Sequence, residues 1–141
     1  MRKFAQVAAK ISTRFFYTCL AAAALSVLVV SCASLPPPIP EGATAAEIIQ
    51  RAQDRSDLYD WKGAQYYYMA ILERFPADRE LTVTAKYELA FIEYKQGHYA
   101  EATKGFEEIL RMYEAPDGSA LSARWKILSV KILEKIKAKG R

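Results

Sequence analysis

An internal repeat limits what this chain can fold into more than any other feature. Shifting the 141-residue sequence by 38 positions places chemically similar side chains on one another. The matched pairs are Trp61 with Tyr99, Ala64 with Ala102, Tyr68 with Phe106, Ile71 with Ile109, Leu72 with Leu110, Phe75 with Tyr113, Ala85 with Ala123, and Tyr87 with Trp125. Eight matches at one offset are hard to obtain by chance. They predict that one unit is used repeatedly and that each copy buries its apolar face on the next.

The spacing of apolar residues identifies this unit as a pair of helices. Apolar side chains recur at steps of three and four, and no useful length of sequence alternates with period two. Thr44 and Glu47 have the pattern of a capping box, and Gly97 suits a left-handed helix exit. We therefore predict an all-α fold. Its helices are expected at about 45–57, 61–75, 79–96, 99–113 and 119–139.

The first 31 residues look like a signal rather than part of the fold. Basic residues and no acidic ones occupy positions 1–14, and an uncharged apolar run of 16 residues follows at 15–30. This layout is typical of a secretory signal, and the run is shorter than the roughly 20 residues of a membrane-spanning helix. The alternative is an uncleaved membrane anchor.

The end of this run resembles the lipobox of bacterial lipoproteins. Val29-Val30-Ser31-Cys32 has the branched and small residues of that motif, followed by its cysteine. The resemblance implies cleavage before Cys32 and acylation of its thiol, which would also account for a lone cysteine in an oxidising compartment. Ala33 follows it, which favours an anchor in the outer membrane facing the periplasm. The alternative is a stray thiol in a membrane anchor.

The part after Cys32 divides into a linker and a helical domain. Residues 34–42 contain four prolines, so we expect residues 32–43 to be a lipidated, extended spacer and residues 44–141 to be the domain.

The composition argues against nucleic acid and against catalysis. Four of the 20 basic residues lie in the signal, so the remainder balances 16 basic against 16 acidic residues. His98, the only histidine, is expected to be a cap or an exposed turn residue, and the Glu107-Glu108 pair a solvated helix face. No phosphate loop or nucleophile signature is present. We expect no enzyme activity, cofactor, metal, nucleic-acid partner or small-molecule substrate.

The repeat resembles the tetratricopeptide repeat, most clearly through one whole copy. Leu89-Ala90, Gly97-His98-Tyr99, Ala102, Phe106 and Ile109-Leu110 follow its pattern. The longer spacing is similar to that of the BamD-like lipoproteins of outer-membrane β-barrel assembly, and equally to periplasmic repeat proteins that coordinate envelope constriction. The resemblance implies about two and a half helix hairpins, with close helix contacts at Ala64, Ala90 and Ala102. Tyr99 and Phe106 would fill the space beside them.

The first copy of the repeat is degenerate, as terminal copies often are. Arg51 stands where a leucine is expected, and Tyr59 aligns with Gly97. In the run of tyrosines at 66–68, Tyr68 is expected in the core because it pairs with Phe106. Tyr66 and Tyr67 are expected to be partly exposed.

The resemblance also implies a concave face that binds peptides. The residues expected on it are Tyr87, Phe91, Tyr94, Lys95 and Trp125. Aromatic anchors beside a cation suit an extended or helical peptide. The alternative is that the aromatic residues are core, and this holds most strongly for Tyr87 and Trp125.

The basic C-terminal tail also has two interpretations. Lys131, Lys135, Lys137, Lys139 and Arg141 either complement a helix dipole or are attracted to anionic head groups.

Together these features predict a membrane-anchored, periplasm-facing scaffold that binds other envelope proteins in outer-membrane protein assembly. Two alternatives stay open. One is an auxiliary lipoprotein partner of a solute-uptake system, and the other is a coordinator of cell-wall growth or division.

Overall fold

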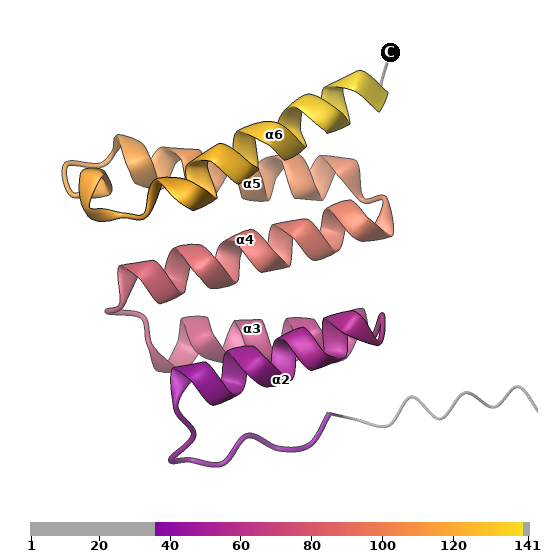
Figure 1. The fold of residues 1–141 in the computed structure, drawn as a ribbon, viewed down its shortest axis with the longest axis vertical. Coiled ribbons are helices and arrows are strands. Elements are labelled where there is room, and N and C mark those ends of the chain that lie inside the picture. Colours follow the sequence, from indigo (N-terminus) through magenta and orange to yellow (C-terminus); the bar gives the residue numbers. More distant parts are fainter. Residues whose placement is uncertain (1–35, 140–141) are drawn as a thin grey trace, which may run out of the picture. The chain divides into compact units, whose positions relative to one another are not determined.

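The computed structural model describes residues 36–139, and every regular element in this part of the chain is a helix (Figure 1). The elements are α2 (Ala45–Asp57), α3 (Trp61–Arg74), α4 (Arg79–Gln96), α5 (Tyr99–Glu114), the short 3-10 helix η2 (Gly118–Ala120) and α6 (Ala123–Lys139). Successive α-helices are joined by short connections and run in opposite directions, so that they form a stack (Figure 1). Residues 36–139 thus have the all-α class that the periodicity predicts.

Local sequence signals set the starts of the first three helices. Thr44 accepts a hydrogen bond from the Glu47 backbone N–H at 3.3 Å, and the Glu47 carboxylate accepts one from the Thr44 N–H at 2.8 Å. The predicted capping box is therefore confirmed. Asp60 accepts from the Gly63 N–H at 3.0 Å, and Asp78 accepts from the Leu81 N–H, also at 3.0 Å. These carboxylates satisfy donors that the first helical turn leaves without partners.

The turns after α2 and α4 use the same unusual backbone conformation. Gly97 ends α4 with φ 84°, as predicted for a left-handed exit. Tyr59, which the repeat aligns with Gly97, has φ 58° and is the only non-glycine with positive φ in the described part of the chain. A left-handed conformation costs an L-residue roughly 1–2 kcal/mol. The degenerate first copy thus keeps the geometry of the second and has a strained residue in its turn.

The core consists of two clusters that share α4. Side chains of α2 and α3 form the first cluster together with Ala85 and Ile92 of α4. Val83, Tyr87 and Ala90 of α4 belong to the second cluster, with side chains of α5 and α6. The central helix therefore buries residues toward both ends of the stack. The expected apolar face of the last helix is confirmed for four residues that are buried in the second cluster or packed against it: Trp125, Leu128, Ile132 and Ile136. Leu121 is buried in the same cluster but precedes the helix.

The alanines implied at helix contacts by the resemblance are buried. Ala64, Ala90 and Ala102 lie in these clusters, and Phe106 is fully buried in the second one. Tyr99 is half-buried.

The last helix begins later than predicted, at Ala123 instead of Ser119. Leu121 has an extended backbone with ψ 144° and is buried, and the Ser122 N–H donates to the Glu80 carboxylate at 3.1 Å. These two tertiary contacts hold residues 121 and 122 in a non-helical conformation. Local sequence signals could not distinguish Ser119 from Ser122 as the helix start.

The proline-rich segment packs on the helices instead of forming a free spacer over its described length. Ile39 is only 8% exposed and belongs to the first core cluster. Arg74 donates hydrogen bonds to the carbonyls of Ile39 at 3.1 Å and Pro40 at 2.7 Å. Tyr67, expected to be partly exposed, is 2% exposed because it is covered here, and its hydroxyl donates to the Pro37 carbonyl at 3.0 Å. The expectation of an extended spacer is therefore wrong for the described residues 36–43, and so is the expectation that Tyr67 is partly exposed.

Candidate binding pocket

Two of the five side chains predicted to form a binding face belong to the core. Tyr87 and Trp125 are each 6% exposed, and their ring centroids lie 4.8 Å apart between α4 and α6. The Trp125 Nε1–H donates to the Glu80 carboxylate at 3.1 Å. Neither ring can serve as an exposed anchor. The spacing of apolar residues indicates that both rings face a neighbouring helix. It does not show that α4 and α6 approach closely enough to cover them.

Tyr94, a third member of that predicted set, is covered by the last helix. Its ring centroid lies 5.9 Å from that of Tyr99, and the Lys139 Nζ lies 5.2 Å from the Tyr94 centroid and 5.0 Å from the Tyr99 centroid. Lys139 also donates to the Tyr99 hydroxyl at 2.9 Å. Hydrogen bonding to this hydroxyl raises the pKa of Lys139. Its ammonium group thus occupies the space over both rings.

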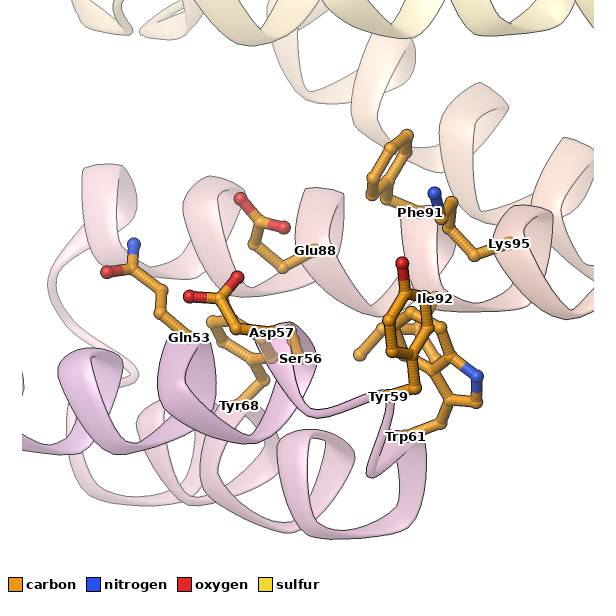
Figure 2. A pocket seen from close by; sticks show the side chains of 10 residues that line it. All are labelled: Gln53, Ser56, Asp57, Tyr59, Trp61, Tyr68, Glu88, Phe91, Ile92 and Lys95. Carbon is orange, nitrogen blue, oxygen red and sulfur yellow. The ribbon is translucent and has the colours of Figure 1, made fainter.

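The remaining two, Phe91 and Lys95, line a pocket of about 330 Å³ between α4, the C-terminal half of α2 and the start of α3 (Figure 2). The Lys95 Nζ lies 6.0 Å from the centroid of the Phe91 ring. The pocket is lined by Gln53, Ser56, Asp57, Tyr59, Trp61, Tyr68, Glu88, Phe91, Ile92 and Lys95. The structure therefore brings part of the predicted face together with residues of the first helix hairpin.

The pocket has a polar end and an aromatic end. Figure 2 shows Gln53, Asp57 and Glu88 together at one end, while Tyr59, Trp61 and Phe91 lie toward the other. The cavity volume is at the lower limit of the roughly 300–1,000 Å³ found for small-molecule pockets. Its size and mixed lining suit a few side chains of a peptide.

Glu88 defines the polar end. Burial raises the pKa of its carboxyl, and the charge of Arg124 offsets part of this effect. Within residues 36–139 no cation lies within salt-bridge distance of this carboxylate. Arg124 instead stacks over the Trp125 ring, with its guanidinium carbon 4.5 Å from the ring centroid. Burial also raises the pKa of Tyr68, so its hydroxyl remains neutral. The polar end consequently presents the carboxylates of Glu88 and Asp57.

Tyr59 defines the aromatic end. Its side chain is 72% exposed, and its ring meets the Trp61 ring edge-on, with centroids 5.5 Å apart and an interplanar angle of 86°. A large aromatic residue is thus held in the open by a strained backbone at the rim of the pocket. Strained residues that persist in a fold are concentrated at functional sites.

Asp57, Tyr59 and Glu88 were absent from the residues predicted from the sequence. Single charges on an amphipathic helix look like solvated residues, and only packing on both sides of α4 shows that Glu88 is desolvated. One signal was present for Tyr59. Its alignment with Gly97 marks a position where the backbone requires an unusual conformation.

The structure also describes His98, which the sequence predicts to be a cap or an exposed turn residue. His98 is exposed at the start of α5, and its Nδ1 lies 2.7 Å from Glu93 Oε2 instead of capping the helix.

Cys32 and the predicted signal lie outside residues 36–139. Within that range there is no cluster of three potential metal ligands, and no helix has the length and apolar character needed to cross a membrane.

Comparison with known proteins gives a relative but no function. The chain is similar to a Treponema pallidum (strain Nichols) protein described as an uncharacterized protein, with 33% identity over 109 residues. The matched region covers 76% of this chain and 44% of the relative, so the chain spans less than half of the relative's length. No protein-family model matches the chain. No solved structure matches it either.

Proposed function

We propose that the chain is a lipid-anchored, periplasm-facing scaffold of the cell envelope that binds segments of other proteins in the pocket between α2 and α4. The observation that carries this proposal is the exposed, strained Tyr59 at the rim of a pocket that also contains Trp61 and Phe91. Aromatic residues that protrude at a cavity are typical anchors for protein partners.

A tetratricopeptide-type arrangement of the helices supports this function. In this arrangement α2 with α3 and α4 with α5 are two hairpins, and α6 is the first half of a third. Small residues at the helix contacts support it, as does the left-handed turn shared by Tyr59 and Gly97. A stack of hairpins presents one helix of each pair on a common face, and a pocket between α2 and α4 lies on that face.

Site-directed crosslinking in the cells that make the protein tests the binding role. A photoreactive phenylalanine analogue replaces Tyr59 in one variant and Glu107, an exposed residue of α5 outside the pocket, in the control. We expect a defined crosslinked protein from position 59 and not from position 107. Components of β-barrel assembly, of a transporter or of cell-wall synthesis would identify the pathway. The absence of a product specific to position 59 would contradict the proposal.

The proposed anchor is tested separately by the mass of the mature polypeptide. We expect an N-terminus at Cys32 that carries acyl chains, and we expect Cys32→Ser to release the protein from the membrane fraction. Two or more chains are needed for stable attachment, since each buried methylene contributes only ~0.8 kcal/mol. A native polypeptide with an unmodified Cys32 and an intact leader would contradict the anchor, whatever the crosslinking shows.

A further inference from the structure

The pocket between α2 and α4 contains two carboxylates that form no salt bridge within the described chain. Glu88 is largely surrounded by protein, yet no side chain of residues 36–139 forms a salt bridge with it. Asp57 lines the same end of the pocket and has no salt bridge in that range either. A desolvated carboxylate without an opposite charge is unfavourable, so a cation that enters the pocket is attracted to this end.

Two cations near the pocket contact aromatic rings. Arg124 stacks over Trp125, and Lys95 lies over Phe91 at the aromatic end. Both contacts have cation–π geometry, and neither cation forms a salt bridge with Glu88. Among residues 36–139, no cation occupies the position beside Glu88 and Asp57 at salt-bridge distance, so this position can accept a basic group of a partner.

The other end of the pocket complements an apolar side chain. Tyr59, Trp61, Phe91 and Ile92 lie together there (Figure 2). In an extended peptide, side chains two residues apart point in the same direction. A single strand of peptide can thus place one side chain at each end of the pocket.

We propose that the pocket binds an extended segment of a partner protein in which a basic residue, Arg or Lys, stands two residues from an apolar one. The basic side chain lies between Glu88 and Asp57, and the apolar side chain packs on Tyr59, Trp61 and Phe91. This inference rests on the proposed function and adds the chemistry of the partner. Charge complementarity selects the basic segment, and acidic segments are repelled.

The test uses the full chain in detergent micelles with short peptides of defined sequence. The peptides are acetylated and amidated, and they contain X-Ser-Leu or Leu-Ser-X between Gly-Ser ends, where X is Arg, Lys, Gln or Glu. Binding is followed by NMR through the indole N–H signals of Trp61, which lines the pocket, and of Trp125, which is buried and bonded to Glu80. The Trp125 signal serves as an internal control.

In at least one of the two arrangements, X-Ser-Leu or Leu-Ser-X, we expect the Arg or Lys peptide to bind about tenfold more tightly than the Gln peptide, as one charge-assisted contact implies. The Glu peptide should bind most weakly. Only the Trp61 signal should shift. Equal affinity for all peptides, preference for Glu, or no binding would overturn the proposal.

Charge variants separate this chemistry from a general loss of fold. Glu88→Gln should reduce the affinity for the Arg peptide about tenfold. Glu107→Gln changes net charge equally outside the pocket and should leave the affinity unchanged. Arg124→Gln removes a repelling cation and should increase the affinity. A decrease in the affinity for the Arg peptide with Arg124→Gln would contradict the proposal. Crosslinking at position 59 combined with no preference for basic peptides would overturn this inference and leave the scaffold function supported.

Discussion

A Cβ atom built on Gly105 of α5 would lie 2.7 Å from the Cβ of Ala90 in α4. The Cβ of Ala90 is attached directly to the backbone and is not the end of a flexible side chain. It therefore cannot move away unless α4 moves with it. The contact between α4 and α5 therefore depends on glycine at one position and alanine at the other. The resemblance implies the alanine, while the glycine becomes evident only from the distance between the helices.

Gly105→Ala should destabilise the protein through this contact. Overpacking costs about 1–3 kcal/mol, and the better helix propensity of alanine returns about 0.5–1 kcal/mol. Ala90→Gly in the same molecule removes the clash. A double-mutant cycle measured by chemical unfolding should therefore give a favourable coupling of about 1 kcal/mol or more. Additive effects of the two substitutions would show that the helices separate freely.

The left-handed turns at Tyr59 and Gly97 should have equal preferences for glycine. Gly97→Ala should lower the free energy of unfolding by about 1 kcal/mol, although the space around the added Cβ is open. At position 59, Tyr59→Gly should be more stable than Tyr59→Ala by a similar amount, because both variants lack the ring. Thermal or urea unfolding measures the two differences. A Tyr59→Ala variant as stable as Tyr59→Gly would mean that the turn relaxes at no cost.

The partly buried carboxyl of Glu88 should make stability depend on pH. Burial raises its pKa above the usual 4.5, so in the window just above pH 4.5 the unfolded chain loses the Glu88 proton while the folded chain keeps it. The folded state then binds more protons, and stability falls as pH rises through this window. The charge of Arg124, which lowers this pKa, limits the effect.

Glu88→Gln should remove this dependence. The variant and the unaltered chain should differ least below pH 4.5, and the variant should become the more stable one as pH rises to 7. Urea unfolding at a series of pH values measures the difference, with Glu107→Gln as the control for an exposed carboxylate. A constant difference across this range would show that Glu88 is fully solvated.

Arg74 should hold the proline-rich segment on the helices. Arg74→Ala removes two hydrogen bonds to the carbonyls of Ile39 and Pro40, each worth about 0.5–1.5 kcal/mol. Cleavage by a glutamate-specific protease after Glu41 should then become faster. Arg111→Ala, which removes an exposed arginine of α5, is the control. Unchanged cleavage at Glu41 would mean that burial of Ile39 holds the segment by itself.

The helices were largely predictable because their signals are local. Thr44, Asp60 and Asp78 set the starts of three helices through their own side chains, and Gly97 ends the third. The start of α6 was predicted wrongly because Glu80, distant in sequence, binds both the Ser122 N–H and the Trp125 indole. Tyr67 was misplaced for a similar reason, since the residues that cover it precede the first helix.

The pocket was less predictable because its residues have different roles in the packing of α4. Tyr87 and Phe91 are one helical turn apart and their rings stack with centroids 6.0 Å apart, but one is core and the other lines the pocket. Helical periodicity cannot separate such neighbours. Periodicity also does not identify Glu88, which lines the pocket together with residues of α2 and is partly buried.

The docked prolines set the length of the tether. The Pro37 carbonyl is bound to Tyr67, and Pro37 lies five positions after Cys32, so a fully extended chain separates these two residues by at most about 18 Å. An acylated Cys32 would therefore keep the helical domain close against the lipid head groups.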